Sequence, residues 1–378
     1  MARRLIGLDI GTNAVTAAEV VPGSPMRLTA FGQVALPRDA MLEGEIVNDV
    51  AVTEAIKRLR SEVGLRKAPV RIGIASPRLV VRQIEMPVMS RADLQGALRF
   101  QIQDLIPIPA SEAVVDFAIL DEILPSHAPD PTSSTDPNEP SASKRTAAPS
   151  LLNADGDPVM RVLLAAAQQS SVMRLVEAVE GAGLPVESVD LIPLALVRSL
   201  GAHSSMTGGA EGIVSIGGGV TCVVVHEGGI PRFVRVLGSG GRELSDAIEV
   251  SLEVSADHAE AWKRQIGIVD DDAVRQAQFA IERPLSMLLD DIRSSLDYYR
   301  NQPGAARLNR VQLTGGGGQL HGLRERLSGL LNVAVERAEP RSGLVVGDIG
   351  FTVDELPRLD PYLSAAVGLA IEIGRAHV

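Results

Sequence analysis

The sequence predicts an α/β protein made of two structurally related halves that enclose a nucleotide cleft. An opening of three β-rich runs with glycine-containing turns between them occurs twice, at 5–37 and again at 212–237. Three glycine-rich turns also follow apolar strands, at 9–13, 215–221 and 313–318. With 378 residues the chain is too long for one simple core, so we expect more than one domain.

Composition limits the classes of function. The net charge of −11 argues against nucleic-acid binding through a broad basic face. Cys222 is the only cysteine, which excludes an intramolecular disulfide and a thiolate metal site and fits a reducing cytoplasm. The apolar run 5–10 is too short for a signal peptide and contains Asp9, and no run of 18 apolar residues occurs. We therefore expect a cytoplasmic protein without direct membrane insertion.

The first part of the chain has the pattern of a compact α/β unit. Apolar residues recur at helical spacing from Val52 to Val63 and stop at Gly64, which predicts a helix. Strands are expected around it, at 5–10, 14–21, 27–37 and 69–75.

A different pattern begins near Arg82. Ser90-x-x-Asp93 is typical of a capping box, and it starts a helix that ends at Pro107. A strand is expected at 113–123. Residues 124–158 are rich in Pro, Ser, Asp and Ala, a composition that cannot offset its ordering entropy by burial, so we expect a mobile surface loop there.

The rest of the chain returns to alternating strands and helices. Ser171 is expected to cap a helix that closes at Gly181, and 204–209 has the composition of a hinge. Strands are expected at 159–167, 186–192, 212–216, 221–227, 230–237 and 308–314. Helices are expected at 194–200, 242–267, 271–302, 321–331 and 360–373.

The glycine turns indicate phosphate binding. Without a Cβ atom, backbone N–H groups can approach an anion closely. The candidate residues are Gly11, Thr12 and Asn13 in the first turn, Gly217, Gly218, Gly219 and Thr221 in the second, and Gly315, Gly316 and Gly317 in the third. Asp9 lies in an otherwise apolar strand, where an unpaired carboxylate is unfavourable. A hydrated Mg²⁺ explains it, because Mg²⁺ is commonly held by one or two carboxylates and phosphate oxygens.

Other nucleotide and catalytic motifs do not fit. The first turn leads into a strand instead of opening a helix, which argues against a Rossmann site, and the chain has no Gly-x-x-x-x-Gly-Lys-[Ser/Thr] run. The six histidines are scattered without His-x-x-x-His spacing, which argues against a metalloenzyme or a Ser-His-Asp hydrolase.

In order and spacing, the three turns resemble the two phosphate motifs and the adenosine motif of the actin, Hsp70 and sugar-kinase superfamily, which has an actin-like (ribonuclease H-like) fold. Within it, the chain is similar to the PilM family of type IV pilus assembly proteins over nearly its whole length. The residues that carry this likeness are 8–15, the run Gln-x-x-x-Leu-Ile-Pro-Ile-Pro that ends at Pro109, 238–243, Asp-Ile-Arg-Ser-Ser-Leu-Asp-Tyr-Tyr at 291–299, and 313–323.

The resemblance implies a division of the chain. The first actin-like half comprises 1–83, 159–203 and 360–378. An inserted strand–helix–strand subdomain occupies 84–158, including the loop 124–158. The second half comprises 204–241 and 306–359, and 242–305 forms its helical cap subdomain.

The resemblance also implies ligands and partners. ATP and Mg²⁺ bind in the cleft, and the segment 238–243 adds Gly240, Gly241 and Glu243 to the nucleotide site. The short cytoplasmic N-terminal peptide of a PilN-like inner-membrane protein binds between the first half and the inserted subdomain. Other pilus motor or platform proteins are further expected partners, at the inner face of the cytoplasmic membrane.

Three departures from the family pattern bear on hydrolysis. Thr16 stands where the family usually has lysine, Ser215 where the second phosphate motif usually begins with aspartate, and Ile192 where an acidic residue is common, although Asp190 is near. Loss of a cation and a carboxylate weakens phosphate neutralisation and the positioning of water. We therefore expect nucleotide binding with slow or no hydrolysis.

Two alternatives share the fold. A sugar-kinase-like phosphotransferase needs a catalytic aspartate facing an acceptor, and the middle of the chain has no convincing Asp-x-Gly motif. An FtsA-like division protein usually ends in a membrane-binding amphipathic helix, and it lacks a sequence of the kind found here at 291–299. Residues 361–373 are mostly small and apolar, which favours core packing.

Overall fold

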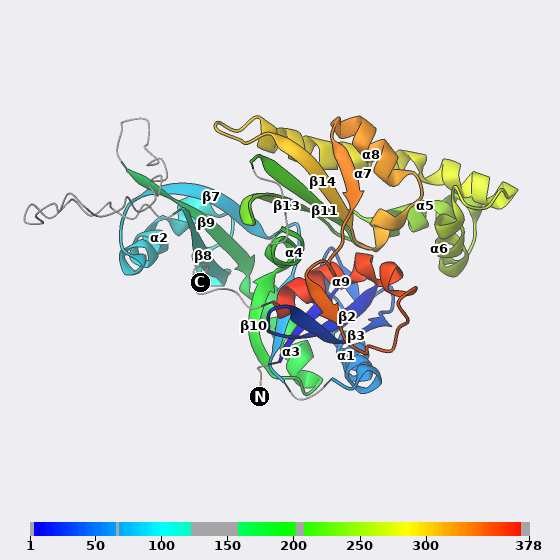
Figure 1. Cartoon of the computed structure of the whole chain (residues 1–378), viewed down its shortest axis with the longest axis horizontal. Coiled ribbons are helices and arrows are strands. Elements are labelled where there is room, and N and C mark those ends of the chain that lie inside the picture. Colours follow the sequence, from blue (N-terminus) through cyan, green and yellow to red (C-terminus); the bar gives the residue numbers. More distant parts are fainter. Residues whose placement is uncertain (1–3, 66–67, 122–157, 202–207, 372–378) are drawn as a thin grey trace, which may run out of the picture.

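The computed structural model describes residues 4–65, 68–121, 158–201 and 208–371. It divides into a lower half, an upper half and a lateral subdomain (Figure 1). Most of the loop expected at 124–158 and of the hinge expected at 204–209 lies outside the described residues. In the described parts, no helix has the length and apolar content needed to cross a bilayer.

The lower half is built on a mixed sheet with β1 at its centre. β1 pairs antiparallel with β2 and parallel with β6. In spatial order the strands are β10 (Val186–Leu191), β6 (Val70–Ile74), β1 (Leu5–Ile10), β2 (Ala14–Val21), β3 (Met26–Ala35) and β16 (Leu344–Val346). A short hairpin of β4 (Met41–Leu42) and β5 (Glu45–Ile46) follows β3.

The upper half repeats this arrangement around β11, which pairs antiparallel with β12 and parallel with β14. In spatial order its strands are β15 (Ala334–Arg337), β14 (Leu308–Thr314), β11 (Ala210–Ile216), β12 (Thr221–Glu227) and β13 (Ile230–Leu237). The order β15-β14-β11-β12-β13 matches β10-β6-β1-β2-β3 strand for strand. The predicted structural repeat is therefore confirmed by the pairing.

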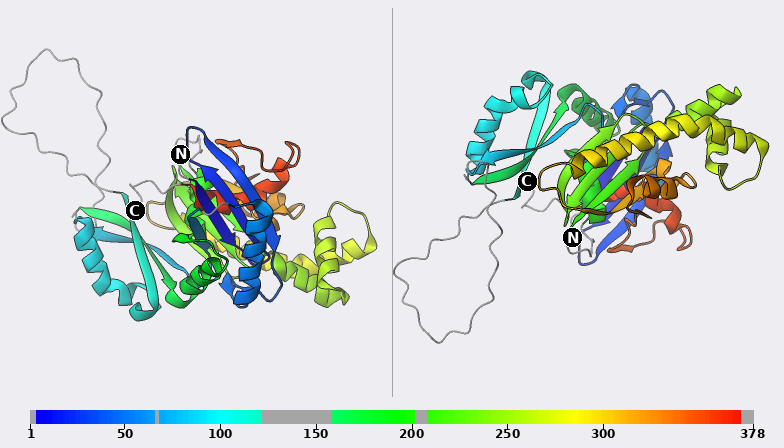
Figure 2. Two further views of the ribbon diagram at one scale, coloured as in Figure 1. Left: turned by 90° about the horizontal axis from the view of Figure 1, so that it is seen from below. Right: turned by 90° about the horizontal axis from the view of Figure 1, so that it is seen from above.

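Helices cover both sheets, and a shared layer joins them. α1 (Asp49–Val63) and α3 (Gln169–Gly181) pack on one face of the lower sheet. The upper sheet carries α5 (Gly241–Leu252), α6 (Ala256–Gln265), α7 (Asp272–Arg300) and α8 (Leu323–Leu331), with α7 running across the strands (Figure 2). Between the sheets lie α4 (Ile192–Leu196), the π-helix η2 (Val197–Gly201) and α9 (Leu356–Ala370), so both halves share one apolar layer.

The lateral subdomain is a small sheet in the order β7-β9-β8, with α2 packed on it. Its elements are β7 (Val80–Pro87), α2 (Arg91–Leu105), the short η1 (Ala110–Glu112), β8 (Ala113–Asp121) and β9 (Val159–Gln168). The predicted cap is present, because the Ser90 hydroxyl oxygen accepts a hydrogen bond from the Asp93 amide at 3.2 Å.

The sheets divide the chain differently from the predicted boundaries. β9 pairs with β7 and β8, although we assigned residues from 159 to the first half. β7 starts at Val80, before the predicted boundary at 84. β16 pairs with β3 in the lower sheet, although 306–359 was assigned to the second half. Each of these strands finds its partner far away in the sequence, which local patterns do not reveal.

Two helix predictions are wrong in detail. The helix assigned to Ser171 starts two residues earlier, at Gln169, and the Ser171 hydroxyl donates instead to Glu45 Oε2 at 2.9 Å. The stretch 242–267 is two helices, because Glu253 adopts a left-handed conformation with φ of 51° and Ser255 caps the second. The closing helix is in the core as expected, with residues 363–370 buried.

Candidate functional site

The first two glycine turns have the same construction and face each other across the two halves. In the β1–β2 turn the Gly11 amide donates to the Ala14 carbonyl at 3.0 Å, and in the β11–β12 turn the Gly217 amide donates to the Val220 carbonyl at 2.9 Å. The Gly219 amide then crosses between the halves to donate to Thr12 Oγ1 at 3.1 Å.

This approach requires glycine. A Cβ atom at Gly218 would lie 2.8 Å from Cγ of Asn13, and one at Gly219 would lie 2.9 Å from Oγ1 of Thr12. Real Cβ atoms essentially never show distances below 3.0 Å, so with a side chain at either position the Asn13 or Thr12 side chain, or the turn itself, must shift. The two predicted phosphate turns therefore close against each other in this structure.

The remaining predicted turns pack behind the second one. The Gly241 amide donates to the Gly217 carbonyl at 2.9 Å, and an ideal Cβ at Gly241 lies 3.5 Å from Cα of Gly317. Gly240 also lies so close to the backbone of Gly217 and Gly218 that it has no room for a Cβ atom. Gly315, Gly316 and Gly317 follow directly after β14. The structure therefore brings together the glycines that the sequence analysis assigned to one site.

Several amides at this junction are free to bind an anion. Among the residues that the structure describes, no protein group accepts a hydrogen bond from the amides of Thr12, Asn13 or Gly218. Thr221 differs from the prediction: it is fully buried, and its hydroxyl donates to the Ser239 carbonyl at 2.8 Å. Thr221 therefore joins the ends of β12 and β13 and does not present its hydroxyl to the cleft.

Asp9 is the titratable group with the clearest perturbation here. Burial raises the pKa of its carboxyl to about 6, because the charged form has lost hydration. None of the described residues donates a hydrogen bond to this carboxylate. Burial, and after it the charge of Asp9, raises the pKa of the Cys222 thiol on β12 to about 12. Cys222 is therefore an inert buried thiol.

The three departures from the family pattern have structural roles. Thr16 lies directly opposite Asp9 in the β1–β2 pairing and accepts a hydrogen bond from Gln33 Nε2 at 3.1 Å. Ser215 pairs with Cys222 and Thr314 in the centre of the upper sheet. Ile192, the third departure, is buried in the apolar layer that the halves share, and the nearby Asp190 forms an ion pair with Arg198, whose Nε donates to the Gly368 carbonyl at 3.0 Å. Through Arg198, Asp190 therefore links β10 to α9.

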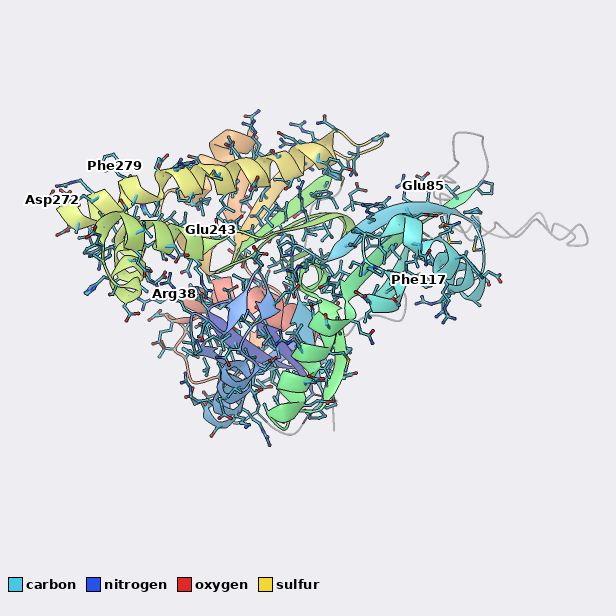
Figure 3. All side chains as sticks on the ribbon, turned by 180° about the vertical axis from the view of Figure 1, so that it is seen from behind. Arg38, Glu85, Phe117, Glu243, Asp272 and Phe279 are labelled. Atoms are coloured by element: carbon cyan, nitrogen blue, oxygen red, sulfur yellow. The ribbon has the colours of Figure 1, made fainter. Side chains whose placement is uncertain are left out.

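Glu243 lies at the start of α5, on the side of the upper half that approaches the lower half (Figure 3). Partial desolvation raises the pKa of its carboxyl, and the nearby carboxylates of Asp246, Asp291 and Glu43 raise it further. Glu43 comes from the lower half, so negative charges of both halves meet at this edge of the cleft. The charged form of Glu243 is therefore unfavourable at this edge unless a cation binds nearby.

Sequence reasoning missed Lys263 on α6. Its ammonium donates to the Gly241 carbonyl at 2.8 Å and to Ser245 Oγ at 2.7 Å, and it lies 2.6 Å from Glu260 Oε2. Burial lowers the pKa of Lys263, whereas the Glu260 carboxylate opposes that shift. In the sequence Lys263 is one polar residue of an amphipathic helix, so no local pattern indicates that it reaches the glycine turns.

Two arginines that sequence reasoning also missed join the halves at the outer edge of the cleft. Arg38, after β3, forms ion pairs with Asp246 and with Glu249 on α5, the second at 2.5 Å. Arg242, at the start of α5, reaches in the opposite direction and donates to the Asn13 side-chain oxygen at 2.8 Å. Figure 3 shows Arg38 where the two halves approach each other.

A cavity of about 630 Å³ adjoins the third turn. Gly315 and Gly318 form one wall, and Arg337, Arg341 and Asp360 contribute polar groups. Arg341 and Asp360 are ion-paired, with Nη2 and Oδ2 2.9 Å apart. The cavity is large enough for a purine base and lies beside the backbone that the sequence assigned to adenosine.

The polar groups around the cleft fit a metal ion that binds together with an anion. They do not fit a metal ion held by protein side chains alone. In the described ranges, no group of three or more His, Cys, Asp or Glu side chains is placed to hold a metal. Asp9 offers one carboxylate without a hydrogen-bond donor, beside turns with free amides. Mg²⁺ is typically held by one or two carboxylates plus phosphate oxygens and water, so these residues fit Mg²⁺ bound together with a phosphate chain.

Comparison with known proteins identifies the family. A family model described as type IV pilus assembly protein PilM matches residues 7–132 and 151–373. The solved structure of the PilM–PilN type IV pilus biogenesis complex has a chain 28% identical to this one, with a TM-score of 0.79 and 97% of each chain covered.

More distant relatives share the architecture. The ethanolamine utilization protein EutJ from Carboxydothermus hydrogenoformans is 15% identical, with a TM-score of 0.53 over 98% of this chain and 90% of that one, a likeness of fold alone. The cell division protein FtsA of Neisseria meningitidis is 24% identical over 277 residues, which are 70% of this chain and 62% of that relative. The match thus spans less than two thirds of the relative's length. The predicted actin-like fold is confirmed, and the chain belongs to the type IV pilus assembly protein PilM family.

Proposed function

We propose that this chain is an ATP-binding scaffold of type IV pilus assembly, with slow or no ATP hydrolysis. The observation that carries the proposal is the meeting of the Thr12–Asn13 turn and the Gly217–Gly219 turn across the two halves, next to the Asp9 carboxylate. A nucleotide that contacts both turns stabilises one arrangement of the halves, and ligand binding alone then biases the conformation.

The proposed roles of the site residues follow from their positions. Free amides of the first two turns bind the phosphates, and Asp9 binds Mg²⁺ directly or through water. Mg²⁺ supplies charge neutralisation for the phosphates when bound. Lys263 and Glu243 lie beside Gly241 and are placed for the sugar or the phosphates, and the cavity beside Gly315 takes the base.

Two positions in the described part of the chain support the expectation of slow hydrolysis. The position opposite Asp9 is the neutral Thr16, and Asp190 is neutralised by Arg198. Neither residue can stabilise developing phosphate charge or orient an attacking water as a free carboxylate would.

Calorimetric titration of the protein with ATP and Mg²⁺, with phosphate release measured on the same samples, tests this function. We expect saturable binding that depends on Mg²⁺ and a turnover far below about 1 s⁻¹, the low end of usual enzyme rates. Turnover that rises when a sugar is added would identify a phosphotransferase instead. No binding at millimolar ATP would show that the cleft does not hold nucleotide, and the scaffold function would then rest on protein partners alone.

We further propose that the chain binds the cytoplasmic N-terminal peptide of a PilN-like membrane protein and is held in this way at the inner face of the membrane. The partner is suggested by the likeness to a chain of the PilM–PilN complex. In the described part of the chain, β8 has a neighbouring strand on one side only, so its other edge can pair with an extended peptide. Val114 on β8 and Met173 on α3 are 44% and 45% exposed, and these two elements contact each other.

Replacing Val114 by aspartate is expected to weaken binding of this peptide at least about 10-fold, because it removes an apolar contact and adds a charge at the interface. A synthetic peptide with the N-terminal sequence of the PilN-like protein from the same genome can be followed by fluorescence anisotropy. Val250→Asp is the matched control, since Val250 is also an exposed valine, at 79%, but lies on α5 in the other half. Equal affinity of the two variants would place the peptide elsewhere.

A further inference from the structure

Arg242 makes an unusual set of contacts at the edge of the cleft. Nη1 donates to the carbonyl oxygens of Arg38 and Met41 at 3.0 and 3.3 Å. Nη2 donates to the carbonyl of Thr12 at 3.1 Å and to Oδ1 of Asn13 at 2.8 Å. All four acceptors are neutral and belong to the lower half, whereas Arg242 belongs to the upper half.

The guanidinium is therefore a partly desolvated cation that contacts no carboxylate of the described residues. Desolvation lowers the pKa of Arg242, the charge of Arg38 lowers it further, and Asp246 opposes both from a longer distance. The neighbouring cations of the cleft differ in this respect. Lys263 is paired with Glu260, and Arg38 is paired with Asp246 and Glu249. Of these three described cations, Arg242 alone lacks a contacting counter-charge.

The unbalanced charge lies at the first phosphate turn. Arg242 holds Thr12 and Asn13 by their oxygen atoms, and the amides of the same two residues are free. Its own amide donates to the Gly218 carbonyl at 2.8 Å, so its backbone is fixed to the second phosphate turn. A charge placed between two anion-binding turns attracts an anion more strongly than either turn does alone.

We propose that Arg242 is the side-chain cation that neutralises, together with Mg²⁺, the phosphates of the bound nucleotide, in a cleft whose β2 strand carries the neutral Thr16. The proposal rests on the proposed nucleotide-binding function and adds to it the residue that supplies the charge. Arg242 is anchored in the upper half and reaches the lower half, so a phosphate chain that it contacts joins the two halves. The bound phosphates then provide the counter-charge that its neutral acceptors do not.

The test compares Arg242→Gln with the wild-type protein in calorimetric titrations with ATP and Mg²⁺, and separately with adenosine. We expect ATP affinity to fall about 10- to 100-fold, the size of one charge-assisted hydrogen bond, and adenosine affinity to stay within about twofold. ATP affinity of the wild type should also decrease more steeply with salt concentration than that of the variant. Arg242→Lys, which keeps the charge, should recover part of the loss.

Arg38→Gln is the matched control, because Arg38 also joins the halves but is already neutralised by carboxylates. An equal loss of ATP affinity in Arg38→Gln and Arg242→Gln would show that both act by holding the halves together, and it would overturn the charge role. Unchanged ATP binding in Arg242→Gln, or an equal loss for adenosine, would overturn it too. If the wild-type protein binds no ATP, the proposed function itself fails, which is distinguishable from failure of the Arg242 role alone.

Discussion

Replacing Asp9 by asparagine is expected to stabilise the ligand-free protein while it removes Mg²⁺-dependent binding of ATP. The folded protein raises the pKa of Asp9 from 3.8 to about 6, so the fold disfavours the charged carboxylate. At neutral pH this amounts to a penalty on the order of 3 kcal/mol that asparagine avoids. The same substitution removes the negative charge that Mg²⁺ requires, so the effects on stability and on ligand binding have opposite signs.

The pH dependence follows from the direction of this shift. Below about pH 4 the carboxyl is protonated in both the folded and the unfolded chain, and Asp9 contributes no penalty. The penalty grows as the pH rises from about 4 to about 6, where the unfolded chain has lost the proton and the folded chain has not, and it is constant above. The stability advantage of Asp9→Asn should therefore be largest at pH 7.5 and about half as large at pH 5.

Urea unfolding of both proteins at these two pH values measures the difference. Ser215→Ala is the matched control, because Ser215 takes the place of Asp9 in the repeated strand of the second half but carries no charge. It should show no comparable pH dependence. An Asp9→Asn variant that is less stable than the wild type at pH 7.5 would contradict the expected penalty for a partly buried carboxylate without a hydrogen-bond donor among the described residues. In the wild type, the affinity for ATP with Mg²⁺ should fall as the pH drops through about 6, because the proton competes with the metal.

The sequence predicted those parts of the site that local chemistry determines. Glycine turns after apolar strands and an aspartate within such a strand are visible without a fold, because each is unusual where it stands. The repeat of the β1–β2–β3 opening then implied that two of the turns occupy equivalent positions. Pairing of β11 with β12 and β14 in the same pattern as β1 with β2 and β6 confirms the structural basis of that argument.

The groups that the sequence did not reveal act at a distance along the chain. Arg242 reaches Thr12, which is 230 positions away, and Arg38 reaches Glu249, which is 211 positions away. Lys263 contacts Gly241 only because α6 folds back after the left-handed break at Glu253. Such contacts depend on how the two halves are arranged, and neither periodicity nor composition carries that information. The same limit applies to β16, whose partner strand β3 lies at the opposite end of the chain.

Replacing Gly7 by alanine is expected to destabilise the lower half strongly. Gly7 lies in the middle of β1, and a Cβ atom there would be 1.9 Å from the carbonyl oxygen of Ala366 and 2.7 Å from the amide nitrogen of Ala370. Both atoms belong to the backbone of α9, which packs directly on β1 and cannot move aside as a flexible side chain would. Overpacking of this kind should lower the free energy of unfolding by about 3 kcal/mol or more.

Gly96→Ala provides the matched control, since Gly96 lies within α2 and an added Cβ atom meets nothing within 4 Å. Alanine favours a helix interior over glycine, so this variant should be more stable by about 0.5–1 kcal/mol. Urea unfolding of both variants measures the contrast. If Gly7→Ala were as stable as the wild type, α9 could not lie against β1 as the structure has it. Asp9 lies on β1 two residues beyond Gly7, so a displaced α9 should also weaken binding of ATP with Mg²⁺. Such a loss would show that nucleotide binding depends on the packing of the shared helical layer.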